Sequence, residues 1–159
     1  MSNPNDHDIQ VLNGLIGAAL DSADIYRDAA AETEDASRRA LLEERSFARR
    51  DVAGELQGAV RGLGGEPAES GSILAKGKRA LMDIRHALMP DTAPIDAIDA
   101  DQGIGQRFEK AIADPKLSAT TRETIRRAHA SVADGQAEMR GLKHSLEGQR
   151  DASGELFPN

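Results

Sequence analysis

The chain has 159 residues, a formal net charge of −7 and no cysteine. This length suits one domain with a sizeable hydrophobic core, and the lack of cysteine excludes disulfides, thiolate nucleophiles and zinc sites built on sulfur. The negative charge disfavours nucleic acid and anionic membrane surfaces as partners, and no apolar run approaches the roughly 20 residues needed to span a bilayer. We therefore expect a cytoplasmic protein with neither a nucleic-acid nor a membrane partner.

The first predicted helix begins near Asp6 or Asp8, either of which can cap it, and runs to about Thr33. Apolar residues three and four apart define its buried stripe: Ile9, Leu12, Ile16, Ala19, Ala23, Tyr26 and Ala30. The apolar arc is wider than one bundle seam requires. Its additional members are Val11, Leu15, Ala18 and Ile25. We interpret this second set as an interface for self-association, with a dimer as the simplest case, or for a protein partner.

A second helix is expected to start after Asp35, with Ser37 as a possible cap, and to stop at Gly64-Gly65. The double glycine followed by Pro67 is a strong terminator, because glycine accepts the left-handed conformation after a helix and proline cannot continue it. The same apolar spacing recurs over residues 72–88. It predicts a third long helix.

The second half of the chain predicts one short and one long helix. Residues 90–94 indicate a linker, and a shorter helix follows that ends at Asp114-Pro115. The last long helix begins near Ser118, which is a good N-cap, and residues from Gly148 onward read as a frayed tail.

These elements together describe an all-α fold. Three long helices, a short extra helix and a fourth long helix are typical of an antiparallel four-helix bundle with a helical insertion before its final element. With one tyrosine and three phenylalanines, the core must consist mainly of Leu, Ile, Val and Ala. We expect a single domain over residues 6–148 with flexible tails at 1–5 and 149–159.

Several segments carry a family resemblance. They are residues 12–16, 21–26 with Ala29-Ala30, 47–56, and the sequence Leu63-Gly64-Gly65-Glu66-Pro67 followed by Gly71-Ser72. From about Asp8 to Leu146 the chain resembles a bacterial family of ferritin-like proteins known only as a domain of unknown function, and the Leu-Gly-Gly-x-Pro element is its most specific part. The resemblance implies a ferritin-like bundle, sometimes associated with stress responses, with no settled activity.

A ferritin-like bundle raises the hypothesis of a di-metal centre, which takes a Glu from each of two helices and a Glu-x-x-His pair from each of the other two. The sequence contains no Glu-x-x-His. The resemblance places a glutamate at Asp101 and a tyrosine where Phe108 stands, and Gln136 lies near a position suited to histidine. An iron or other divalent-metal site would have to be non-standard, drawing on Asp21, Asp83, His86, Asp101 and His129.

Other polar residues have plain structural interpretations. We expect Arg45 at the flank of a helix with its aliphatic stem against the bundle; the alternative is a guanidinium inside the bundle, paired with an Asp or Glu of a neighbouring helix. We expect His129 as a satisfied residue between helices and Tyr26 in the core with its hydroxyl bonded. Short basic pairs such as Arg49-Arg50 are interleaved with acids and predict surface ion pairing rather than nucleic-acid contacts.

The preferred functional interpretation is a non-enzymatic bundle, without a cofactor, that acts through self-association or partner binding. The alternative is a metal-binding ferritin-like protein with the non-standard carboxylate and histidine site. A third possibility, nucleic-acid protection by an assembled oligomer, requires a basic surface that the net charge argues against.

Overall fold

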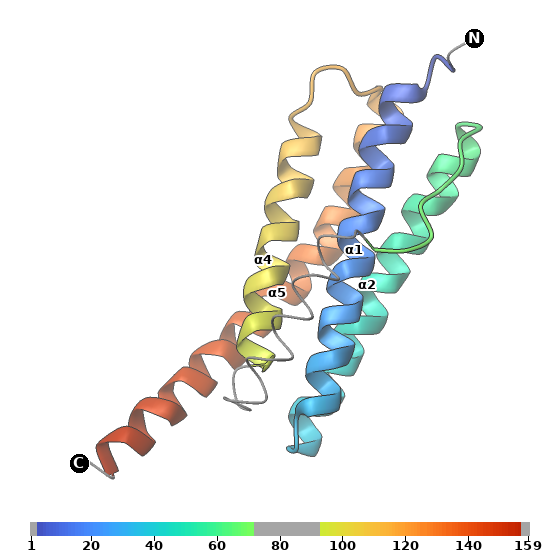
Figure 1. The fold of residues 1–159 in the computed structure, drawn as a ribbon. Helices are drawn as coiled ribbons and strands as arrows, with labels where there is room; N and C mark the ends of the chain where they lie inside the picture. Colours follow the sequence, from blue (N-terminus) through green and yellow to red (C-terminus); the bar gives the residue numbers. More distant parts are fainter. Residues whose placement is uncertain (1–2, 72–92, 157–159) are drawn as a thin grey trace.

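The computed structural model describes residues 3–71 and 93–156, which form four helices and no strand. These helices are α1 (Asp6–Glu32), α2 (Ala36–Gly62), α4 (Ala93–Ile112) and α5 (Ala119–Leu156) (Figure 1). The predicted all-helical class is confirmed. The third predicted helix, residues 72–88, lies outside the described residues.

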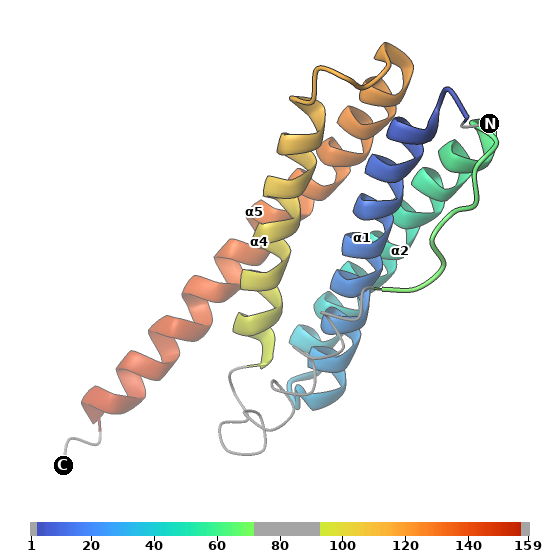
Figure 2. The same cartoon turned by 45° about the horizontal axis from the view of Figure 1, so that its top comes forward.

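The four helices form a ring of neighbours. α1 packs on α2 and α4, and α5 packs on the same two helices from the opposite corner. α1 and α5 run in one direction and α2 and α4 in the other, so each pair of neighbours is antiparallel (Figures 1 and 2). After α2 the chain turns back along α1, where the Asn13 side chain donates to the Glu66 carbonyl at 3.0 Å and accepts from the Ala68 amide at 2.8 Å. The result is a helical bundle.

The helix expected as a short insertion is instead a full member of this ring. α4 has 20 residues, because buried positions recur along it at three- and four-residue spacing from Ile98 through Asp101 and Ile104 to Phe108. Pro94 falls within its first turn, where the missing N–H has no helical partner to lose. The prediction of a short extra helix is therefore wrong.

Two of the helix ends follow the predicted chemistry. Gly64 has φ +81°, and the Gly65 amide donates to the Val60 carbonyl at 3.0 Å, so the double glycine ends α2 as expected. Ser118 caps α5, because its hydroxyl accepts from the Thr121 amide at 3.3 Å.

Two other helix ends differ from the prediction. Asp35, not Ser37, caps α2 by accepting from the Arg38 amide at 2.9 Å. α5 continues past Gly148, where we expected fraying, to Leu156, and in Figure 1 it extends beyond the first turn of α4. A single glycine inside a helix costs only about 1 kcal/mol, and the next proline is Pro158.

The interior contains two hydrophobic clusters at different heights of the bundle. The large cluster joins residues 12–19 of α1, 52–60 of α2, 104–111 of α4 and 117–132 of the α4–α5 loop and α5. The small cluster joins residues 25–30 of α1 to Leu42, Ala97, Ile98 and Met139. Between the two clusters, α1, α2 and α4 each place a polar side chain in the interior: Ser22, Arg49 and Asp101.

The structure also accounts for the wide apolar arc of α1. Leu15 and Ala18 belong to the large cluster and Ile25 to the small one, each at most 7% exposed, and Val11 is partly buried against the large cluster. α1 needs the wide arc because it packs on two neighbouring helices of its own chain. These four side chains therefore do not offer the free apolar surface on which the predicted interface depended.

Candidate functional site

A buried ion pair occupies the middle of the bundle. The Arg49 guanidinium of α2 donates to both carboxylate oxygens of Asp101 on α4, from Nε to Oδ1 at 2.7 Å and from Nη2 to Oδ2 at 2.6 Å. The two side chains are 0% and 1% exposed. This bidentate geometry is the strongest form of arginine–carboxylate contact. Because both side chains are removed from water, their electrostatic attraction is stronger still.

The other two helices complete the layer around this pair. The Ser22 hydroxyl of α1 donates to Asp101 Oδ1 at 3.1 Å. From α5, the Gln136 side-chain amide donates to the Asp101 backbone carbonyl at 2.9 Å, and the Val132 carbonyl accepts from Arg49 Nη2 at 3.5 Å. All four described helices thus contribute to one polar layer, which we define as Ser22, Arg49, Asp101 and Gln136.

The spacing of the sequence explains why these polar groups are inside. Arg49 lies seven residues from the buried Leu42 and from the buried Leu56. Seven residues are close to two helical turns, so all three residues share one face. Asp101 lies seven residues before the buried Phe108 in the same way. When the apolar faces of α2 and α4 pack in the core, Arg49 and Asp101 are therefore buried with them and can pair.

Gly105 allows Gln136 to reach the layer. A side chain at this buried position of α4 would begin with a Cβ only 2.7 Å from Gln136 Nε2. The lack of a Cβ lets the amide lie directly against α4 and reach the Asp101 carbonyl.

Tyr26 and Arg45 lie next to the layer. Tyr26 is 0% exposed, and burial, together with the negative charge of Asp101, raises the pKa of its hydroxyl, so the phenol stays neutral. Although Asp101 is close enough to affect this pKa, the hydroxyl makes no hydrogen bond of acceptable distance and angle. The expected position of Tyr26 in the core is confirmed.

Arg45 reaches further into the bundle than a flank position. Its side chain is only 12% exposed, and a Cβ added to Gly135 of α5 would overlap its guanidinium. Arg45 therefore crosses from α2 to the surface of α5, in space that the glycine leaves open.

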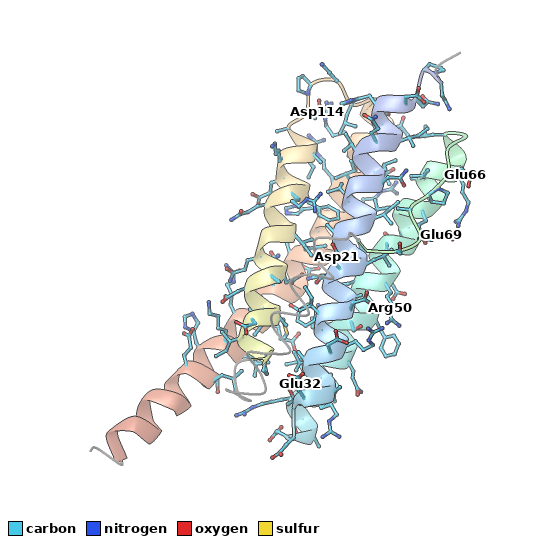
Figure 3. All side chains as sticks on the ribbon, in the orientation of Figure 1. Asp21, Glu32, Arg50, Glu66, Glu69 and Asp114 are labelled. Carbon is cyan, nitrogen blue, oxygen red and sulfur yellow. The ribbon has the colours of Figure 1, made fainter. Side chains whose placement is uncertain are left out.

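The residues proposed for a metal site have different surroundings. Asp101 is committed to Arg49 and Ser22. His129 stacks on Phe108 with ring centroids 6.3 Å apart and lies 3.8 Å from Glu109. Asp21 is half-buried on α1 beside Gly71 (Figure 3).

Asp21, Asp101 and His129, the three candidates that the structure describes, do not come together as a metal centre. In the parts of the chain that it describes, no three histidine or acidic side chains form a group that could hold a metal ion. Asp83 and His86 lie outside the described residues. With a guanidinium on both of its oxygens, Asp101 does not fit the role of a metal ligand.

Two of the four residues in the polar layer, Ser22 and Arg49, were not predicted from the sequence to be part of a site. Arg49 was assigned to a surface basic pair, and Ser22 was not singled out. The signal that locates both was present, because each interrupts an apolar heptad: Leu42, Arg49 and Leu56 in α2, and Leu15, Ser22 and Ala29 in α1.

A second polar cluster joins the start of α1 to the loop between α4 and α5. The Asp8 carboxylate accepts from the Ser118 hydroxyl at 2.6 Å and from its amide at 3.3 Å, and His7 pairs with Asp114 at 2.7 Å. Figure 3 shows Asp114 at this end of the bundle. Burial of Asp8 works to raise its pKa, but hydrogen bonds from Ser118 and Thr121 outweigh it and lower the pKa. These contacts hold the start of α1 against the loop between α4 and α5.

Comparison with known proteins identifies the family but no activity. No curated protein matches the chain. Among the described residues, no helix combines the length and apolar character that crossing a membrane requires. A family model described as a domain of unknown function (DUF2383) matches residues 7–114, which include α2, α4, all of α1 except its first residue, and three members of the polar layer. Because the match covers more than half of the sequence, the chain belongs to the DUF2383 family.

Proposed function

We propose that this protein is a ferritin-like bundle that acts without an enzymatic centre, by associating with a second copy of itself. The observation that carries the non-enzymatic part is the Arg49–Asp101 ion pair, which fills the middle of the bundle. In ferritin-like di-metal proteins that position holds inward-facing carboxylates and histidines. Here a guanidinium stands where a cation would bind.

The outer face of α2 supports the association part. Phe47 is 63% exposed, and it is the one large hydrophobic side chain so exposed among the described residues. Gly54 and Gly58 follow on the same face, seven and eleven residues later, and a Cβ at either would meet nothing within 4 Å. Glycine inside a helix costs about 1 kcal/mol relative to alanine, and no packing within the described chain requires it here.

This face is suited to a close helix–helix contact between identical copies. Glycines let two backbones approach closely, and a two-fold interface places the same patch on both partners. Exposed charges of both signs surround Phe47, including Arg50, Asp51 and Glu55, and Figure 3 shows Arg50 on the outer side of α2. An antiparallel pair of α2 helices can match these charges.

Analytical ultracentrifugation over a range of concentrations tests the proposal. We expect the wild type to dimerise and Phe47→Asp to sediment as a monomer with unchanged helicity. The matched control is Ala133→Asp, which adds the same charge at an exposed position of α5 and should leave the dimer intact. A wild type that stays monomeric at all concentrations, or a Phe47→Asp variant that dimerises like the wild type, would refute association through this face.

A further inference from the structure

We propose that the bundle binds a small inorganic anion of about the size of chloride, held by Arg45, Arg49 and the Tyr26 hydroxyl beside the polar layer. The proposal does not depend on self-association, because all three groups lie within one chain. The anion would accept hydrogen bonds from buried donors of these three residues that have no acceptor within the described chain.

Three buried polar atoms in this region have no hydrogen-bond partner: Arg49 Nη1, Arg45 Nε and the Tyr26 hydroxyl oxygen. Arg49 and Tyr26 are both 0% exposed, so bulk water does not reach them. An unsatisfied buried polar group destabilises the folded state, and native proteins contain few of them. The three groups can therefore serve a common hydrogen-bond acceptor.

The three groups converge because of helical spacing. Arg45 and Arg49 are four residues apart and share one face of α2, as Ser22 and Tyr26 share one face of α1. The Gly135 gap directs the Arg45 guanidinium across to α5. Arg45, Arg49 and Asp101 all act electrostatically on the Tyr26 hydroxyl, so both guanidinium groups lie near it.

The charges in this region do not balance. Two guanidinium groups face one buried carboxylate, which Arg49 already engages at both oxygens. The one ion pair that Arg45 makes among the described residues is to Glu44 at 3.9 Å, and Glu44 is 67% exposed. An exposed pair at this distance contributes about 0–1 kcal/mol. The ion pair that the structure describes for Arg45 therefore compensates its charge only weakly.

An anion satisfies both requirements. The arginine atoms donate, and the neutral phenol can also donate, so the ligand must accept from all three. A water molecule could accept these bonds but would leave the positive charge, and a cation would be repelled. Because side chains from all four helices surround the site, the ligand must be small, and chloride is the simplest probe.

Two measurements on the full chain test this inference. Chlorine NMR in sodium chloride should show excess line broadening by the protein that saturating bromide removes. Crystals grown in sodium bromide should show one anomalous peak between Arg45 and Arg49. Loss of one charge-assisted hydrogen bond, about 1.5–3 kcal/mol, should weaken chloride affinity roughly 10- to 100-fold in Arg45→Gln.

Matched variants separate this site from surface binding. Arg50→Gln removes the same charge from an exposed position of the same helix and should retain wild-type broadening. Tyr26→Phe removes only the hydroxyl and serves if Arg45→Gln does not fold; it should bind chloride more weakly. Equal broadening in the wild type, Arg45→Gln and Tyr26→Phe, or an ordered water without an anomalous peak at this position, would overturn the proposal.

Discussion

Removing the Asp101 carboxylate should destabilise the protein severely. In Asp101→Ala, the Arg49 guanidinium loses both of its short bonds and stays at a position with 0% exposure, and Ser22 loses its acceptor. Removing one partner of a buried ion pair leaves the other charge unpaired and typically lowers the free energy of unfolding by about 3–5 kcal/mol. Domains of this kind have a total stability of about 5–15 kcal/mol. The expected fall in Tm is roughly 6–20 °C.

Urea unfolding followed by helical circular dichroism measures this loss. The control is Asp99→Ala on the same helix, which also breaks an ion pair, to Lys143 at 2.6 Å, but at a side chain that is 49% exposed. The control should cost at most about 1 kcal/mol. Equal losses in the two variants would refute the reasoning, because they would mean that the Asp101 pair is as exposed to solvent as the surface pair.

A double variant tests the origin of the loss. Arg49→Met combined with Asp101→Leu replaces both charges with apolar side chains, so no charge is stranded. Such replacements are often neutral or stabilising. We expect the double variant to regain most of the stability that Asp101→Ala loses. A double variant as unstable as the single one would show that the core at this height tolerates no apolar filling.

The remaining predictions concern the end of the bundle and the packing of Arg45. Because the folded state lowers the pKa of Asp8 below the ordinary value of an aspartate, its contribution to stability is present above about pH 4 and is lost as the pH falls through the folded pKa. The difference in unfolding free energy between the wild type and Asp8→Asn, measured in urea, should therefore shrink as the pH falls below about 4, and a difference that is constant with pH would contradict this. Gly135→Ala forces the Arg45 guanidinium to move and should cost about 1–3 kcal/mol, whereas Gly141→Ala, where a Cβ meets nothing within 4 Å, should gain up to about 1 kcal/mol. Thermal unfolding compares the two alanine variants, and equal values would contradict the packing of Arg45 on α5.

The sequence predicted the helices better than their roles. Apolar spacing and the Gly64-Gly65 stop located α1 and α2 well, because these signals are local. α4 was taken for a short insertion because a predicted linker precedes it and Asp114-Pro115 follows it, although its buried positions continue through five turns. Whether a helix joins a bundle depends on which neighbours it packs against, and that is not a local property.

The interior polar layer was predictable in principle but was missed. Arg49 lies in a basic pair that resembles surface charge, and its partner Asp101 is 52 residues away. Only the heptad position of Arg49 distinguishes it from Arg50, its exposed neighbour. The wide arc of α1 led to the opposite error, since the pattern shows that two faces are buried but not that both are covered by the same chain.

Iron content tests most directly the proposal that the bundle has no enzymatic metal centre. The untagged protein is incubated anaerobically with excess ferrous iron, desalted and submitted to elemental analysis. We expect the wild type to retain almost no iron, because Arg49 already neutralises Asp101. The proposal would be contradicted by about two retained iron ions per chain, the number that a di-metal centre holds, if Asp101→Ala abolished that retention.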